Sequence, residues 1–544
     1  MNTRQLQTDK NQKLYHALLG ILLVCALAMM MLLSYWACKY SYYGAVDGRT
    51  RGVLVGDKTW AHIAVFLAAS LCTMGIDKVL MKKDKSQQEK ICLCTLIVTS
   101  VIAFILGVFY VCKNPYYPVG DQINTTAFAA YCRDGNFSML SIGGYVGMYQ
   151  QQKGLAILYE ILFTLFGDFN YRPAKILHVV WWILTILAGY GFLKLNTDRP
   201  VFRMLYCVMM LGCFPLLFYL PYIYGDVLSI SFGIILFYGV AAYEHSGQKR
   251  YIALASFAAG LAVLARKNTW IVLVAVAVYV LLVSLRKKKV RYLMAGTAIL
   301  LTAALSVKAV DVIYEVRSGY PSGVGVPSIL WVAMGLQETE GRAGVYNRYQ
   351  QATFTDYDCQ QELAAQQGKE YIRERLEEFS QDPGMAFNFF KNKVEGQWIE
   401  PMYAALESTE SFEEGAELSP VLESLYYGEL GRTIWKLTNY YQSILYLAGL
   451  MALVMLGILW WKKKEVPISL WLPWIAVFGG FLFSILWEAK SRYVFPYCVF
   501  MILYAPEGLY QTGLLLCKLP KLRKFKKSGH TQDKGEEASL RETA

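Results

Sequence analysis

Charged residues are scarce in this sequence. Asp, Glu, Lys and Arg make up 17% of its 544 residues, whereas hydrophobic residues make up 55%. Soluble globular domains carry about 25% charged residues. The composition therefore excludes an ordinary soluble protein and favours a polytopic membrane protein, in which each spanning helix needs about 20 apolar residues.

Signals for metal and nucleic-acid binding are also missing. The cysteines lie mostly inside apolar segments, and Cys92 and Cys94 have neither the spacing nor the second half of a zinc finger. The formal net charge is +12, but the basic residues form short clusters between apolar runs, which is typical of a topology signal. We expect no metal, no cofactor and no nucleic-acid partner.

Apolar runs long enough to cross a membrane recur along the chain, and only the segment near 313–440 lacks them. The sequence thus predicts an all-α polytopic membrane protein. We expect about twelve spans, near 14–36, 59–77, 91–112, 174–194, 203–221, 226–243, 251–265, 269–285, 292–312, 441–461, 467–487 and 492–514.

Basic clusters predict the orientation of these spans. Lysine and arginine favour the cytoplasmic side, which places both termini inside and Asp121 outside. The run Leu155–Phe166 then cannot cross, and at about 12 residues it is too short to do so. We expect it to lie along the outer membrane surface together with a helix over Gln122–Arg133. The clusters are Lys78–Lys85, Arg286–Arg291, Lys462–Lys464 and Lys518–Lys527.

The chain divides into six predicted segments. Residues 313–440 are too short and too poor in aliphatic residues for an independent core, so we expect an extracytoplasmic cap packed on the membrane helices. The other segments are N-terminal transmembrane helices (1–112), a first outside loop with two interfacial helices (113–173), a transmembrane bundle (174–312), C-terminal transmembrane helices (441–514) and a basic, disordered cytoplasmic tail (515–544).

Three short polar breaks fall on the predicted outer side with Asp121, at 221–226, 266–268 and 488–492. Cations there oppose the usual preference of lysine and arginine for the inside. Two explanations stay open. The side chains could snorkel or pair with Glu488, or they could bind an anionic head group. The cations are Arg266, Lys267, Lys490 and Arg492.

The order of these pieces resembles the GT-C superfamily of membrane glycosyltransferases, in the bacterial branch related to protein O-mannosyltransferases and the lipid A aminoarabinose transferase. The matching pieces are PVGDQINTTAFAAYCRDGNFSML with GGYVGMYQQQKGLAILYEILFTLFGDFNYRPAKIL, PYIYGDVLSISF, RKNTWIVLVAV, PSILWVAMGLQ with GVYN, and WEAKSRYVFPY. The chain differs from the better-known branches of this superfamily in three ways. It has three apparent helices before the loop that contains Asp121, it has Asp-Gln where mannosyltransferases have paired acids, and it has no Trp-Trp-Asp motif.

The resemblance implies a GT-C-type bundle in a plasma membrane, with a sugar on a polyprenyl phosphate as donor. The sugar would pass with inversion to an extracytoplasmic glycan, lipid or protein of the cell envelope. Asp121 is the expected catalytic base for the acceptor hydroxyl; alternatively, it caps the helix that follows. The expected contacts of the donor phosphate are Arg266, Lys267, Lys490, Arg492 and Tyr493.

Other residues have two explanations each. Asp226 begins a helix, so it either caps that helix or serves as a second acid near the donor sugar. Tyr117, Gln122, Tyr145 and Trp331 are candidate sugar contacts, although aromatic residues gather at membrane interfaces for general reasons. Because no second acid stands beside Asp121, we expect transfer without a metal.

Two other function classes compete with this interpretation. A transporter or flippase of lipid-linked saccharides would also have many helices and basic residues, but would place ionisable groups near the membrane midplane. A polymerase or ligase of surface polysaccharide would centre on arginine and histidine in the late outside loop, and this loop contains no histidine.

Overall fold

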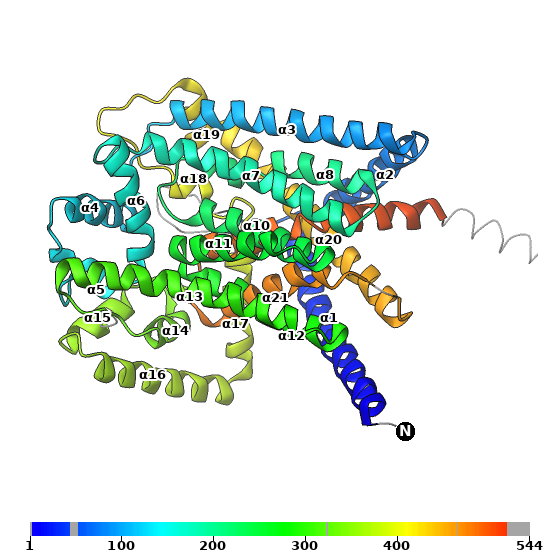
Figure 1. The fold of residues 1–544 in the computed structure, drawn as a ribbon. Coiled ribbons are helices and arrows are strands. Elements are labelled where there is room, and N and C mark those ends of the chain that lie inside the picture. Colours follow the sequence, from blue (N-terminus) through cyan, green and yellow to red (C-terminus); the bar gives the residue numbers. More distant parts are fainter. Residues whose placement is uncertain (1–2, 44–52, 323–324, 465, 519–544) are drawn as a thin grey trace, which may run out of the picture.

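The computed structural model describes residues 3–43, 53–322, 325–464 and 466–518 and is almost entirely helical (Figure 1). Within these ranges nine helices are long and apolar enough to cross a membrane, which confirms the prediction of an all-α polytopic membrane protein. They are α1 (Thr3–Lys39), α2 (Thr59–Leu80), α3 (Lys85–Lys113), α7 (Arg172–Asn196), α10 (Asp226–Ser246), α12 (Trp270–Lys287), α13 (Val290–Ser318), α20 (Glu429–Trp461) and α21 (Leu472–Leu486).

The other three predicted spans correspond to shorter or interrupted helices. The span over 203–221 is divided into α8 (Pro200–Leu211) and α9 (Phe214–Phe218), with Gly212 and Pro215 at the break. Glycine and proline end helices in this way. The second is α11 (Lys249–Ala265), and the third begins with α22 (Ser491–Met501), which contains Pro496.

Helix α10 lies at the centre of the bundle, between α7 and α11. Its sequence alternates bulky and small residues, so neighbouring helices approach closely. A Cβ added at Gly239 would lie 3.1 Å from the Cβ of Ala255 and from the Tyr251 carbonyl oxygen on α11. A Cβ added at Gly233 would lie 2.8 Å from the ring of Phe500.

The link from α3 to α7 folds into short helices at one end of the long helices, at the left of Figure 1. Helix α4 packs against α6 there. The two helices predicted in this loop, Gln122–Arg133 and Leu155–Phe166, are thus present, each beginning slightly earlier. The elements are α4 (Asp121–Arg133), the 3-10 turn η1 (Ser138–Leu140), α5 (Tyr145–Met148) and α6 (Gln152–Phe166).

The segment that follows α13 packs on the bundle. Its own hydrophobic clusters are small, and one of them contains Leu330, Phe354 and Ala364. Trp398 connects the segment to the bundle, because its side chain is fully buried and its indole N–H donates a hydrogen bond to Ser484 Oγ on α21 over 3.0 Å. Its elements are α14 (Ile329–Gly335), β3 (Glu338–Thr339), β4 (Arg342–Ala343), α15 (Tyr349–Asp356), α16 (Gln361–Gln381), α17 (Pro383–Trp398), α18 (Ala405–Ser408) and α19 (Pro420–Tyr427).

A small antiparallel hairpin joins α1 to α2. Strand β1 (Tyr40–Tyr43) pairs with β2 (Val53–Gly56). The hairpin attaches to the segment after α13, because the amide of Tyr42 donates to the Ile399 carbonyl over 3.0 Å. At the other end of the chain the helix after α22 continues to Lys518, so the tail predicted from residue 515 is helical at its start, and its remainder, 519–544, lies outside the described residues.

Candidate active site

A cavity of about 420 Å³ lies where the ends of several helices meet. We call it the Asp121 cavity. Its volume is within the range of small-molecule sites, roughly 300–1,000 Å³. It is lined by Asp121 at the start of α4, by Trp331 of α14 and by parts of all three polar breaks. The predicted residues that it brings together are Asp121, Arg266, Lys267, Trp331, Lys490, Arg492 and Tyr493.

Asp121 is the first residue of α4, and its exposed carboxylate is oriented by a tyrosine. The Tyr145 hydroxyl donates to Asp121 Oδ1 over 2.8 Å. Burial, followed by the charge of Asp121, raises the pKa of Tyr145, so this phenol stays protonated as a donor. The N-cap is Gly120, and no side-chain capping bond forms there. The capping explanation for Asp121 is therefore wrong.

Gly120 gives the chain the turn that begins α4. Its φ of +58° and ψ of −126° lie in a region that residues with a Cβ avoid. No atom lies within 4 Å of the place where a Cβ would stand. Glycine is therefore required here for its backbone conformation and not for lack of space. This conformation sets the direction in which α4 and its first residue, Asp121, continue from the loop.

Asp226 binds two of the predicted phosphate contacts. Its Oδ2 accepts from Arg266 Nη1 at 2.5 Å, and its Oδ1 lies 3.9 Å from Arg492 Nε. The carboxylate is 3% exposed. The N-cap of α10 is Gly225, without a side-chain capping bond, so the capping explanation is wrong here too. Asp226 lies in a smaller space beside the Asp121 cavity, where it fixes two guanidinium groups.

Gly225 allows this pairing. A Cβ added to it would lie 2.0 Å from the Ala265 carbonyl oxygen, which no side chain tolerates. The loop before α10 therefore lies directly against the end of α11. Arg266 also covers the rings of Tyr224 and Tyr493, with its Cζ 5.2 and 5.5 Å from the ring centroids. These cation–π contacts add to the ion pair.

Lys267 and Lys490 differ from the two arginines. Lys267 Nζ lies 3.5 Å from Ser328 Oγ. Neither ammonium group forms an ion pair with a carboxylate in the part of the chain that the structure describes. Four cations and two carboxylates, Asp121 and Glu488, line the cavity. With Asp226 behind the two arginines included, four cations stand against three carboxylates. The two lysines, which have no ion-pair partner among the described residues, make this side of the cavity suitable for an anionic ligand.

Glu488 is the second carboxylate of the cavity, and a pair between it and the neighbouring cations was one of the explanations left open by the sequence. Its hydrogen-bond partner is instead the Tyr493 hydroxyl, 3.4 Å from Oε1. Burial raises the pKa of Glu488 to about 7, with Lys490 opposing this shift and Asp121 adding to it. This side chain can therefore donate or accept a proton near neutral pH.

One side of the cavity is aromatic. Trp331 stacks on Trp487, with ring centroids 5.9 Å apart and planes within 5°. Tyr149 meets the edge of Trp331 at 6.2 Å and contacts Tyr145 at 5.2 Å. Rings aligned in this way give flat apolar faces beside the polar groups. Such faces suit the ring of a sugar.

Three of the candidate sugar contacts, Tyr117, Gln122 and Tyr145, do not line the cavity. Tyr145 reaches it only through its hydrogen bond to Asp121. Gln122 is 4% exposed and accepts a hydrogen bond from the Tyr116 hydroxyl. Tyr117 packs edge-on against Tyr171 at 5.9 Å. Gln122 follows Asp121 on α4, and one step along a helix turns a side chain by about 100°, so Gln122 points to the core while Asp121 points to the cavity. Tyr117 precedes α4 and is not part of a helix.

Several lining residues were not singled out in the sequence. Gln152, for example, donates to the Tyr224 hydroxyl over 2.6 Å and so fixes one side of the cavity. Most of these residues lie within the segments that resemble the GT-C superfamily, but nothing in those segments distinguishes them from their neighbours as lining residues. The group comprises Gln151, Gln152, Tyr224, Asn268, Tyr346, Gln350 and Trp487.

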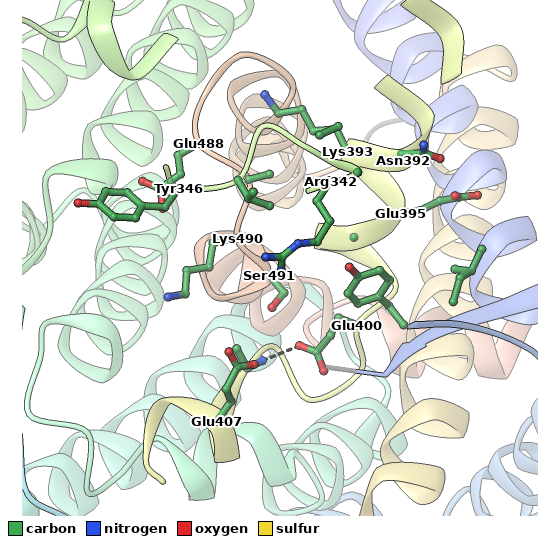
Figure 2. A pocket seen from close by; sticks show the side chains of 18 residues that line it. Arg342, Tyr346, Asn392, Lys393, Glu395, Glu400, Glu407, Glu488, Lys490 and Ser491 are labelled. Atoms are coloured by element: carbon green, nitrogen blue, oxygen red, sulfur yellow. Dashed lines mark hydrogen bonds between the residues drawn. The ribbon is translucent and has the colours of Figure 1, made fainter. Parts of the chain in front are cut away.

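A second cavity, of about 450 Å³, adjoins the first and is shown in Figure 2. It lies between α17, strand β4, the β1–β2 hairpin and the residues before α22. Tyr346, Glu488 and Lys490 line both cavities. Lys393 is 1% exposed in its wall, and its ammonium donates to the Gly335 carbonyl. Burial lowers the pKa of Lys393 to about 7.

Glu400 in this second cavity predicts a pH dependence of stability. The backbone amides of Met402 and Ala404 donate to its carboxylate over 2.9 and 2.5 Å, and burial raises its pKa to about 7. The folded chain therefore binds this proton more tightly than the unfolded chain. The contribution of Glu400 to the free energy of unfolding is largest below pH 4.5 and is lost as the pH rises to about 7, a change of roughly 3 kcal/mol for a shift of this size.

We expect the apparent melting temperature in detergent to fall between about pH 5 and pH 8, and to fall less in Glu400→Gln. Glu488 and Lys393 titrate in the same range, and Lys393 acts in the opposite direction. The quantity to compare is therefore the slope of melting temperature against pH in the wild-type chain minus that slope in the variant. Equal slopes would show that Glu400 does not take up this proton.

No group of three or more His, Cys, Asp or Glu side chains is arranged to hold a metal ion within residues 3–43, 53–322, 325–464 and 466–518. In comparisons with known proteins, no protein-family model matches the chain, and no curated protein and no solved structure matches it.

Proposed function

We propose that this chain is an integral membrane glycosyltransferase of the GT-C type. It moves a sugar from a polyprenyl-phosphate donor to an extracytoplasmic acceptor of the cell envelope. The observation that carries the proposal is one cavity at the helix ends, in which an Asp121 carboxylate oriented by Tyr145 shares the space with Arg266, Lys267, Lys490 and Arg492.

In the proposed reaction Asp121 removes the proton of an acceptor hydroxyl. The hydroxyl oxygen bonds to the anomeric carbon, and the bond from that carbon to the phosphate oxygen breaks. The electron pair leaves with the polyprenyl phosphate, and attack from the opposite face inverts the anomeric centre. General-base assistance of this kind contributes about two to four orders of magnitude in rate.

The departing phosphate requires positive charge that is already in place. Arg266 and Arg492 are fixed by Asp226, and a guanidinium can donate two parallel hydrogen bonds to phosphate oxygens. Lys267 and Lys490 supply point charges. Tyr493, beside both arginines, completes this side. With four cations available, we propose that transfer needs no divalent metal.

Lys267 and Lys490 give a prediction on the donor side. Each change to alanine should weaken binding of a polyprenyl phosphate about tenfold, as expected for loss of one charged hydrogen bond of about 1.5 kcal/mol. The chain should stay folded, because neither ammonium is ion-paired in the described structure. Lys369→Ala on the exposed face of α16 is the matched control. Unchanged affinity in both variants would place the phosphate elsewhere.

The proposed site faces the outside of a plasma membrane, with both termini in the cytoplasm. A cysteine at the exposed Glu413 should therefore react with a membrane-impermeant maleimide in intact cells, above the background of the native chain. A cysteine at Lys83, between α2 and α3, should react only after permeabilisation. The reverse pattern would invert the orientation.

The direct test is transfer of a labelled sugar from a polyprenyl-phosphate donor by membranes that contain the chain. The transporter or flippase alternative gives a different result, because a transporter would bind the lipid and move it without cleaving the sugar. Donor binding without transfer from any donor would therefore favour that alternative.

A further inference from the structure

The second cavity is connected to the Asp121 cavity through shared walls. Tyr346, Glu488 and Lys490 line both spaces. A molecule that fills the second cavity therefore reaches residues that also line the Asp121 cavity. Such an arrangement suits two substrates that react at the junction, one from each side.

The lining of the second cavity offers both donors and acceptors of hydrogen bonds. Figure 2 shows Arg342 near the middle, Glu400 and Glu407 on one side, and Glu488 and Lys490 on another. The remaining polar groups include Asn392, Lys393, Glu395 and Ser491, and two aromatic rings, Tyr42 and Tyr346, complete the set. The aliphatic side chains of the lining are Leu54, Ala343, Val345, Ala404 and Ala489.

One of these polar groups, Glu395, is enclosed in the wall of the cavity. Glu395 is 3% exposed, and its Oε1 has no hydrogen-bond partner among the described residues. The nearest cation, Lys391, lies 3.8 Å away. Oε1 is itself buried, so this carboxylate belongs to the wall of the cavity, and Lys391 is its ion-pair partner.

The lining disfavours several ligands. Four acidic side chains stand beside three basic ones, without the excess of cations that a phosphate or another strong anion requires. An acyl or prenyl chain would leave the charged groups without partners. Sugar hydroxyls both donate and accept, so one neutral molecule can satisfy carboxylates and cations together. The tyrosine rings provide faces for the apolar side of a sugar.

We propose that the second cavity is the acceptor subsite of this chain and that the acceptor is a saccharide, bound through its hydroxyl groups. The proposal rests on the proposed function, since it names the acceptor class for the same reaction. The volume of about 450 Å³ is in the range of small-molecule sites. Glu488, at the junction, is the positioning residue that directs one hydroxyl toward Asp121.

Gly396 offers a way to close this cavity without touching the Asp121 cavity. It lies on α17 in the wall, and a Cβ added there would meet only the Tyr42 ring, at 4.0 Å. The indole of Gly396→Trp would therefore occupy the space. Gly75→Trp is the matched control, because Gly75 is exposed on α2 with nothing within 4 Å of its Cβ position.

The experiment measures binding of disaccharides to the purified full chain by saturation-transfer NMR, with maltose, lactose and diacetylchitobiose as probes. At least one should bind the wild-type chain and Gly75→Trp. Gly396→Trp should bind the disaccharide with an affinity at least tenfold lower than that of the wild type, and should bind a polyprenyl phosphate with the same affinity as the wild type. If no disaccharide binds the wild type, or if Gly396→Trp binds as well as the wild type, the proposal is overturned.

If Gly396→Trp fails to fold, Glu407→Gln replaces it and should weaken disaccharide binding while polyprenyl phosphate binding stays the same. Failure of the proposed function gives a separate result. Disaccharide binding without sugar transfer by wild-type membranes would reject the glycosyltransferase and leave a saccharide site. Transfer that Gly396→Trp leaves unchanged would reject the acceptor subsite and leave the glycosyltransferase.

Discussion

Asp121→Asn should lower sugar transfer by about two to four orders of magnitude, the usual contribution of a general base. Asparagine has the shape of aspartate and can accept the same hydrogen bond from Tyr145, which joins the hydroxyl to Oδ1 over 2.8 Å. It cannot take up the proton of an acceptor hydroxyl. Binding of a polyprenyl phosphate should therefore remain while turnover is lost.

The measurement compares initial rates of transfer in membranes that hold equal amounts of each chain. Asp134→Asn is the matched control, since it makes the same change at an exposed residue at the other end of α4. Its rate should equal that of the wild type. Transfer by Asp121→Asn at the wild-type rate would remove Asp121 from the chemistry, and the search for a base would move to Glu488.

The membrane helices could be read from the sequence because burial in lipid requires long apolar runs whatever the tertiary contacts are. Nine such helices are present in the described residues. The predicted span over 203–221 shows the limit of this argument. Its composition is apolar throughout, but Gly212 and Pro215 divide it into α8 and α9.

The sequence also predicted that the three polar breaks lie at the same end of the bundle, because successive spans run in opposite directions and each break follows a span of the same direction. It did not predict which charged side chains of the breaks pair with one another. Arg266 was expected to bind a head group or Glu488, but its partner is Asp226, 40 positions away. Which of several nearby carboxylates a cation meets depends on helix rotation and on close approaches such as that of Gly225 to Ala265.

The second cavity had no signal in the sequence at all. Its walls come from the β1–β2 hairpin, β4, α17 and the residues before α22, which are far apart in the chain. Lys393 and Glu395, for example, lie in a helix of mixed polar and apolar residues, and nothing in the sequence indicates that these two are buried. In the structure both are almost completely buried, because the end of α17 packs against α21 and α22.

Asp226→Asn should destabilise the chain by about 3 kcal/mol or more, the usual cost of removing one partner from a buried ion pair. The carboxylate is 3% exposed and holds Arg266 and Arg492. Its loss leaves two guanidinium groups close together without a counter-charge. The rings of Tyr224 and Tyr493 contact both arginines and can compensate only part of this loss, since a cation–π contact contributes about 0.5–2 kcal/mol.

Thermal unfolding of the purified chain in detergent measures this effect. Asp168→Asn is the control, because Asp168 pairs with Arg133 at side-chain exposures of 39% and 29%. Exposed ion pairs contribute about 0–1 kcal/mol, so this variant should unfold close to the wild type. An equal and small shift in both variants would mean that Asp226 is not the counter-charge of the two arginines.

A second substitution separates loss of the ion pair from loss of packing. If unpaired arginine charge causes the instability, then Asp226→Asn combined with Arg266→Gln should be more stable than Asp226→Asn alone, because one uncompensated charge is gone. Damage to packing would instead accumulate in the double variant. The double variant should nevertheless bind a polyprenyl phosphate poorly, since restored stability would come at the loss of a cation that the proposed donor site requires.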